Sequence, residues 1–217
     1  MNQDLKTQQQ EQKESADCYS AGERAAMVWW QDLRERWLSP LLKLMSSLGI
    51  RPDHLTLASL LVGLMFCPMI FYVPWLAFVC LILHSAIDGL DGPLARHQRV
   101  DSKAGSFTDT MCDQLILVAV TVTMMCHPDL LIGILPGTIY IFLYTVVVVF
   151  AMVRNAMGIP YSWVVRPRFL IYIWLALEFF VFPGSIFAGS TNIVLWITNA
   201  LFALKMLTGF LKIRDKL

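Results

Sequence analysis

The stretch from Asp88 to Asp113 reads DGLDGPLARHQRVDSKAGSFTDTMCD, and it follows the apolar run VPWLAFVCLILHSAI of residues 73–87 without a break. It places four carboxylates, Asp88, Asp91, Asp109 and Asp113, on or beside segments that otherwise suit a lipid environment. One carboxylate inside a membrane costs roughly 3 kcal/mol, and four crowded carboxylates cannot all be ionised without a compensating cation. The stretch therefore predicts membrane helices with a charged site between them.

The composition is that of a membrane protein. Hydrophobic residues make up 57% of the 217 residues and charged residues only 15%, against about 45–50% and about 25% in an average soluble domain. We therefore expect the lipid bilayer as a partner and no nucleic acid. A helix needs about 20 apolar residues to cross the hydrocarbon core. The apolar runs predict six spans, at residues 55–72, 73–96, 105–127, 130–153, 168–188 and 191–213.

The basic residues predict the orientation of these spans. Seven of the 17 Lys and Arg residues precede the first span, three lie at 96–103, three at 154–168 and four at 205–216. The short turns at the opposite ends of the spans carry none. Because Lys and Arg concentrate in cytosolic loops, we expect both termini and the two longer loops on the cytosolic side. The expected location is the inner membrane of a bacterium.

The region before the first span divides into two segments. Residues 1–20 are polar and rich in Gln, which predicts a disordered cytosolic tail. Residues 21–48 repeat apolar side chains such as Trp30 and Trp37 at helical spacing. This pattern predicts an amphipathic helix in the membrane interface, or alternatively a soluble linker helix packed on the protein's own loops. The predicted fold class is all-α: an integral membrane domain of residues 21–217, with six transmembrane helices preceded by the interfacial helix.

The four carboxylates are spaced so that each pair shares one face of its helix. Asp88 and Asp91 stand three residues apart, and Asp109 and Asp113 stand four apart. For the first pair alone, a solvated helix end is an equally simple interpretation. The whole set instead favours one or two divalent ions with oxygen ligands, and Mg²⁺ or Mn²⁺ in particular if the site also binds phosphates.

A longer pattern surrounds the carboxylates. The spacing Asp-x2-Asp-Gly-x2-Ala-Arg-x8-Gly-x3-Asp-x3-Asp is matched at every fixed position from Asp88 to Asp113. In this pattern the sequence resembles the CDP-alcohol phosphatidyltransferase family, and most of all its phosphatidylinositol phosphate synthase and phosphatidylglycerophosphate synthase members. A Pro-Asp-x-x-Thr stretch at residues 52–56 extends the resemblance, which covers roughly residues 21–217. The family has six membrane helices and an interfacial N-terminal helix, and it implies a homodimer.

The resemblance implies roles for individual residues. Two Mg²⁺ or Mn²⁺ ions would be bound by Asp88, Asp91, Asp109 and Asp113. Asp113 would also be the catalytic general base for the acceptor hydroxyl. The residues implied to bind the CDP-linked donor are Asp53, His54, Leu55, Thr56, Gly92, Arg96 and Ser102.

The reaction implied is transfer of a phosphatidyl group from CDP-diacylglycerol to the hydroxyl of a small alcohol, with release of CMP. The metals would neutralise developing charge on the diphosphate while Asp113 accepts the proton. One alternative is an enzyme that uses CDP-choline or CDP-ethanolamine as donor and diacylglycerol as acceptor. Another is a cation-binding membrane scaffold without turnover, which the complete motif disfavours.

Three arginines bear on the identity of the acceptor. Arg154, Arg166 and Arg168 crowd the cytosolic loop and helix ends around the fourth and fifth predicted spans. Family members with phosphorylated acceptors carry a basic pocket there, and arginine suits bidentate phosphate binding. The alternative is that the three only set the topology of the membrane helices, so the class of acceptor stays open.

Glu178 is the one acid within an apolar span far from the motif. If that span runs to a turn near Gly189, Glu178 lies about 16 Å from the outer boundary, where an unpaired carboxylate is costly. We therefore expect Glu178 to face the protein interior or a subunit interface. Its predicted hydrogen-bond partner is Asn199 or Lys205, and its predicted role is structural.

Overall fold

The computed structural model describes residues 37–128, 132–158, 167–181 and 189–217. The predicted tail of residues 1–20 and the first part of the predicted interfacial helix lie outside these ranges. The described elements are α3 (Pro52–Leu64), α4 (Phe66–Tyr72), α5 (Pro74–Gln98), α6 (Lys103–Cys126), α7 (Ile134–Ala156), α8 (Pro167–Phe180) and α9 (Thr191–Arg214). The prediction of an all-α membrane fold is confirmed.

Within the described ranges, five segments are long and apolar enough to cross a membrane: Pro52–Tyr72, α5, α6, α7 and α9. The first of them is broken at Met65, between α3 and α4. Pro68 explains the break, because it has no N–H to offer the carbonyl of Leu64. The 14 residues of α8 reach only about 21 Å. The rest of the predicted span at 168–188 lies beyond what the structure describes.

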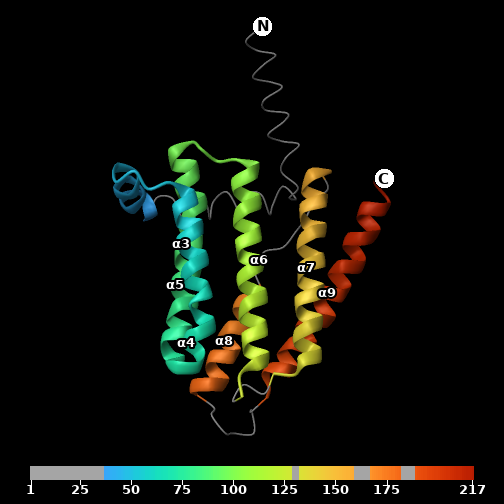
Figure 1. Cartoon of the computed structure of the whole chain (residues 1–217). Helices are drawn as coiled ribbons and strands as arrows, with labels where there is room; N and C mark the ends of the chain where they lie inside the picture. Colours follow the sequence, from blue (N-terminus) through green and yellow to red (C-terminus); the bar gives the residue numbers. More distant parts are fainter. Residues whose placement is uncertain (1–36, 129–131, 159–166, 182–188) are drawn as a thin grey trace.

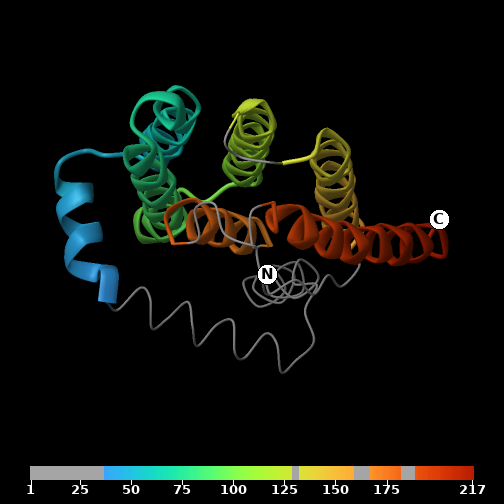
Figure 2. The same cartoon turned by 90° about the horizontal axis from the view of Figure 1, so that it is seen from below.

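The segment Pro52–Tyr72, which comprises α3 and α4, and the helices α5 to α9 alternate in direction along the chain. Helix α3 packs against α5, and α7 packs against α9. As a result, the C-terminal ends of α5, α7 and α9 and the N-terminal end of α6 gather at one end of the bundle (Figure 1). Seen along the bundle in Figure 2, α8 and α9 lie in a row on one side of α6 and α7. This arrangement brings the carboxylates near the C-terminal end of α5 close to those near the N-terminal end of α6.

The helix of residues 37–47 lies across the axis of the bundle, beside α3 and α5 (Figures 1 and 2). On its inner side Leu42 is only 1% exposed and packs with Leu55 and Leu94. Trp37, which is 79% exposed, lies on the opposite side with Leu41, Leu44 and Leu48. These four residues recur every three or four positions and form one apolar face. That face is typical of a helix lying in a membrane interface.

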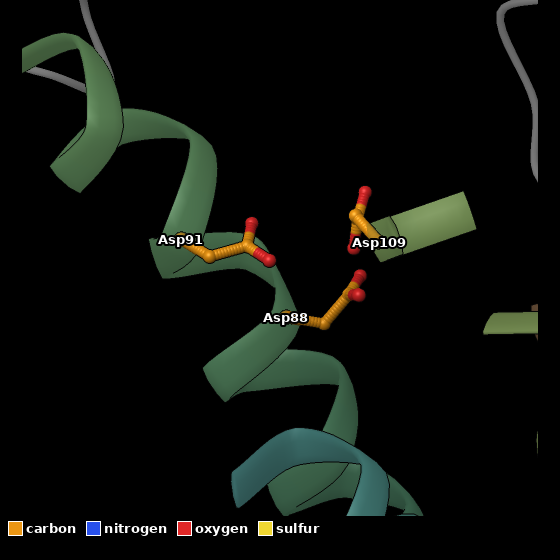
Figure 3. A group of neighbouring side chains, drawn as sticks. All are labelled: Asp88, Asp91 and Asp109. Atoms are coloured by element: carbon orange, nitrogen blue, oxygen red, sulfur yellow. The ribbon is translucent and has the colours of Figure 1, made fainter. Parts of the chain in front are cut away.

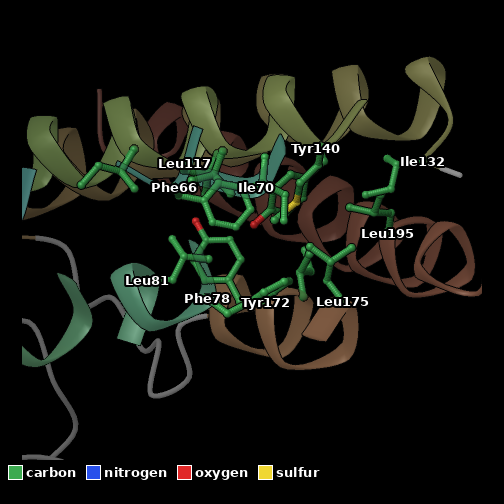
Figure 4. Packing of buried hydrophobic residues seen from close by; sticks show 14 of the residues in the cluster. Phe66, Ile70, Phe78, Leu81, Leu117, Ile132, Tyr140, Tyr172, Leu175 and Leu195 are labelled. Atoms are coloured by element: carbon green, nitrogen blue, oxygen red, sulfur yellow. The ribbon is translucent and has the colours of Figure 1, made fainter. Parts of the chain in front are cut away.

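A large hydrophobic core contains side chains from every helix from α4 through α9 (Figure 4). Phe66 of α4 meets Phe78 of α5 edge to face, with ring centroids 5.8 Å apart. From the other helices the core receives Leu117, Tyr140, Leu175 and Leu195, each at most 2% exposed. Such close packing fixes the rotation of each helix about its axis, and with it the direction in which the site carboxylates point.

The structure corrects the partner predicted for Glu178. Its carboxylate accepts hydrogen bonds from the backbone N–H groups of Gly189 and Thr191 and from the hydroxyls of Ser190 and Thr191. None of these bonds involves Asn199, whose amide donates to the carbonyl of Pro136 at 2.9 Å, or Lys205, which is exposed. The depth estimate was wrong because α8 ends at Phe180. Glu178 therefore lies level with the start of α9 and satisfies its free N–H groups.

Candidate active site

Three of the four motif carboxylates converge between α5 and α6. Asp88 and Asp91 project from α5 toward Asp109 of α6 (Figure 3), and one oxygen from each lies within 4.8 Å of the others. The tight connection between the helices makes this possible. Arg99 ends α5 in the left-handed conformation (φ 58°), and the N–H of Val100 bonds back to the carbonyl of Ala95 at 2.9 Å.

Neighbouring groups hold Asp91 in place. The hydroxyl of Thr56 on α3 donates to Asp91 Oδ2 at 3.0 Å, and the N–H of Gly92 donates to Asp91 Oδ1 at 2.6 Å. Asp88 and Asp91 are each only 8% exposed. Asp109 Oδ1 is buried and has no hydrogen-bond partner among the described residues. Three convergent carboxylates with an unsatisfied buried oxygen fit a divalent cation such as Mg²⁺ or Mn²⁺.

Asp113 lies outside this group of three, one turn further along α6. Its Oδ1 forms an ion pair with Arg168 Nη1 at 2.6 Å, and Arg168 Nη2 lies 3.5 Å from Asp88 Oδ2. Arg168 is only 1% exposed. The sequence placed Arg168 among residues at the cytosolic helix ends, whereas the structure places it against the carboxylates. It thereby supplies a positive charge beside Asp113, in addition to Arg96 of the motif.

The other two arginines of the predicted acceptor site are not seen beside Asp113. Arg154 lies in the last turn of α7 and is buried, with 6% of its surface exposed. Arg166 falls outside the described residues. Of the two arginines that the structure describes, it is Arg168 that pairs with Asp113.

Two residues that the sequence did not single out as functional lie on the other side of Asp113. The first is close to Asp113, and the second is hydrogen-bonded to the first. His84 of α5 has its Nε2 3.9 Å from Asp113 Oδ1. Its Nδ1 is hydrogen-bonded to Ser59 Oγ of α3 at 2.7 Å. Spacing along the chain gives no sign that His84 contacts the motif.

A cavity of about 860 Å³ opens beside the carboxylates, between α3, α5 and α6. Its lining includes five of the seven predicted donor residues, namely Asp53, Thr56, Gly92, Arg96 and Ser102, together with Asp91, Gly105 and Asp109. His54 and Leu55 do not line it. On a helix, residues 53 and 56 share a face from which 54 and 55 point away. The nitrogen of His54 accepts a hydrogen bond from the N–H of Arg51, and Leu55 is buried against Leu42.

The cavity also has lining residues for which the resemblance implies no role. They are Arg51, Pro52, Leu57, Ala95, Gln98, Val100, Asp101, Ala104, Ser106, Thr108 and Cys112. Most come from the α5–α6 connection and the first turns of α6. Ser102 is the N-cap of α6, and its hydroxyl accepts a hydrogen bond from the N–H of Gly105 at 3.0 Å. Only the folded connection brings them to the cavity.

The charges and size of the cavity limit what it can bind. Four carboxylates but only two guanidinium groups line it, so an anionic diphosphate would be repelled unless cations accompany it. Its volume lies within the range of roughly 300–1,000 Å³ that is usual for small-molecule sites. The geometry therefore suits a phosphate-bearing ligand that binds together with divalent metal.

The sequence of residues 50–208 matches the CDP-alcohol phosphatidyltransferase family. The chain belongs to this family. The resemblance found in the motif is thereby confirmed, as is the assignment to a family of transferases. With its several apolar helices, this CDP-alcohol phosphatidyltransferase family member is a multi-pass membrane protein.

Two characterised or named relatives match shorter stretches. The bifunctional IPC transferase and DIPP synthase of Aquifex aeolicus (strain VF5) is 30% identical over 76 residues, which are 35% of this chain and 18% of that protein. The inner membrane protein YnjF of Escherichia coli (strain K12) is 38% identical over 73 residues, which are 33% of this chain and 35% of that protein. The chain thus spans about a fifth and about a third of these relatives.

Two crystal structures of Mycobacterium tuberculosis phosphatidylinositol phosphate synthase (PgsA1) share the fold. The structure with CDP-DAG bound has a TM-score of 0.66 at 17% identity and covers 82% of this chain and 93% of its own. The complex with manganese and citrate has a TM-score of 0.65 at 16% identity and covers 80% and 87%. At these identities the likeness establishes the fold alone.

Proposed function

We propose that the protein transfers a phosphatidyl group from CDP-diacylglycerol to the hydroxyl of a small, phosphorylated alcohol and releases CMP, as a step of phospholipid biosynthesis. The observation that carries the proposal is the cavity of about 860 Å³ with Asp91 and Asp109 in its wall. It combines space for a nucleotide diphosphate with the carboxylates that a bound metal needs. The donor found in the PgsA1 structure supports a CDP-lipid in the same fold.

The donor would be held by the residues that line the cavity. Asp53 and Thr56 of α3, Gly92 and Arg96 of α5, and Ser102 before α6 face one space. The side chain of Arg96 passes over Gly92. A Cβ atom added at Gly92 would lie 3.5 Å from Arg96 Nη1. A guanidinium group in this position suits a phosphate oxygen.

The metal ligands proposed are Asp88, Asp91 and Asp109, with Mg²⁺ or Mn²⁺ as the ions and two as their number. When bound, the ions neutralise charge on the diphosphate and improve CMP as a leaving group. The manganese in a PgsA1 structure supports a divalent ion in this fold. Asp113, whose Oδ1 pairs with Arg168, is proposed as the fourth ligand of these ions and as the acceptor of the proton.

The reaction requires only one proton transfer by a side chain. The acceptor oxygen attacks the β-phosphorus, a new P–O bond forms, and the bond from that phosphorus to the CMP oxygen breaks with its electron pair going to CMP. Asp113 accepts the proton of the attacking hydroxyl. Beyond this, the chain positions donor and acceptor in line and keeps water from taking the acceptor's place.

Arg168 is the basis for proposing a phosphorylated acceptor. Its guanidinium group lies beside the carboxylate that would take the acceptor proton, so an acceptor phosphate near this position meets a positive charge. Arg154 and Arg166 would extend the basic surface. We further propose that the charged ends gathered in Figure 1 face the cytosol and that the protein works as a homodimer.

The test is release of CMP by the purified protein in lipid nanodiscs. CDP-diacylglycerol is supplied with Mg²⁺ or Mn²⁺ and with one acceptor at a time, either inositol phosphate, glycerol phosphate, free inositol or serine. We expect CMP and a new phospholipid only with a phosphorylated acceptor and only with the metal. Activity with CDP-choline and diacylglycerol instead would establish the reverse use of the lipid, and no CMP with any pair would favour a scaffold.

A further inference from the structure

Two buried polar side chains, Ser59 and His84, connect α3 to the proposed general base. Ser59 Oγ lies 2.7 Å from His84 Nδ1, and His84 Nε2 lies 3.9 Å from Asp113 Oδ1. Ser59 is 3% exposed and His84 is 1% exposed. His84 Nε2 has no hydrogen-bond partner among the described residues. A buried imidazole nitrogen without a bond is costly, and the nearest acid to it is Asp113.

The hydrogen bond from Ser59 selects the tautomer of His84. If the serine hydroxyl donates to Nδ1, the proton of the neutral imidazole sits on Nε2 and faces the Asp113 carboxylate. If the hydroxyl instead donates to the His84 carbonyl, which is 3.4 Å away, Nδ1–H must donate to serine and Nε2 presents a lone pair to an acid. The 2.7 Å contact fits a hydrogen bond in either direction, and the Asp113 carboxylate near Nε2 favours the first arrangement.

The ring of His84 has little freedom to turn away. Gly63 of α3 lies so close that a Cβ added there would be 3.2 Å from His84 Cγ and 2.7 Å from a methyl carbon of Ile116. The helix backbone of α3 thus covers one face of the imidazole, because glycine has no side chain in the way. The tautomer and the orientation of the ring are both fixed by α3.

We propose that His84 is a positioning residue that, with Ser59, aims the Asp113 carboxylate at the acceptor hydroxyl. Arg168 holds Asp113 Oδ1 from the α8 side at 2.6 Å, and His84 restrains the same oxygen from the α5 side. A carboxylate restrained at one oxygen in this way has a fixed orientation, which sets the direction in which its other oxygen points. The inference rests on the proposed function, because it takes Asp113 as the general base.

The experiment compares His84→Leu with His84→Gln, whose amide nitrogen can take the place of Nε2. We expect kcat to fall about 10- to 100-fold in His84→Leu, the size that misplacing a reacting group produces, and to recover within about 5-fold of wild type in His84→Gln. The KM for CDP-diacylglycerol and the binding of Mn²⁺ should change less than about 3-fold in both. Ser59→Ala should lower kcat less than His84→Leu does. Its matched control is Ser85→Ala, whose hydroxyl bonds only to the carbonyl of Leu81 in its own helix.

A double-mutant cycle tests whether the effect passes through Asp113. In the Asp113→Asn background, His84→Leu should add less than about a 2-fold further loss, since the group it positions is gone. A fully additive loss, or a kcat of His84→Leu within 3-fold of wild type, would overturn the positioning role while leaving the proposed reaction intact. If His84→Leu does not fold, His84→Gln and Ser59→Ala decide the question. Absence of CMP release by wild type with every acceptor would remove the proposed function, and the inference with it.

Discussion

Replacing Glu178 by Leu tests how the N-terminal end of α9 is held. The carboxylate accepts from Gly189 N at 2.5 Å and from Thr191 N at 2.8 Å, and from the hydroxyls of Ser190 and Thr191. The N–H of Thr191 is among the four at the start of α9 that have no partner within the helix, and the N–H of Gly189 lies two residues before that start. A hydrogen bond to a charged group contributes about 1.5–3 kcal/mol.

Two such backbone bonds give a loss of about 3 kcal/mol or more in Glu178→Leu. The hydroxyls can turn to other partners, and Ser190 Oγ keeps the bond it accepts from Trp174 Nε1. For a chain of 217 residues, each kcal/mol lowers Tm by about 2–4 °C, so Tm should fall by about 6–12 °C. Glu178→Gln keeps an acceptor but not the charge, and it should lose about half as much.

The assay is a thermal melt in detergent followed by tryptophan fluorescence, for which Trp174 is a local probe. Thr208→Ala is the control, because its exposed hydroxyl bonds only within α9, to the carbonyl of Lys205. CMP release at low temperature should stay within a few fold of wild type in both Glu178 variants. A Tm for Glu178→Leu within 2 °C of wild type would refute the reasoning.

Further predictions concern the acceptor arginines and the support of Asp91. Arg154→Ala should raise the acceptor KM with donor binding unchanged. Arg168→Ala should do the same and also lower Tm, because breaking a buried ion pair costs about 3–5 kcal/mol; equal use of an unphosphorylated alcohol by wild type would count against both. Thr56→Val keeps the shape of the side chain but removes the hydroxyl that donates to Asp91. It should weaken Mn²⁺ binding about 10-fold by calorimetry, and unchanged affinity would show that Thr56 does not support the site.

The sequence predicts the parts of this protein that depend on local spacing. The all-α membrane fold followed from run lengths, and the meeting of Asp88, Asp91 and Asp109 followed from helix periodicity on two helices joined by a tight turn. The break near Met65 was not predicted, because the apolar run of residues 55–72 gives no sign of where one helix ends and the next begins.

What the sequence could not give depends on the rotation and depth of helices that are distant in the chain. His84 lies beside Asp113. This position depends on Gly63, which has no side chain and lets α3 pack closely against the imidazole. Arg168 reaches Asp113 because α8 begins beside the carboxylates and not at the end of the bundle. For the same reason, Glu178 binds the start of α9 where a depth estimate pointed to Asn199.

The central claim is that Asp88, Asp91 and Asp109 together hold the metal on which transfer depends. The most direct measurement is Mn²⁺ binding and CMP release in Asp109→Asn, which keeps the size of the side chain while it removes the charge beside the unsatisfied Oδ1. Asp215→Asn is the matched control, since Asp215 is an exposed acid paired with its neighbour Arg214. We expect Asp109→Asn to lose Mn²⁺ binding by at least about 10-fold and CMP release entirely, with Tm in the absence of metal no lower than that of wild type. CMP release at the wild-type rate in Asp109→Asn would contradict the claim.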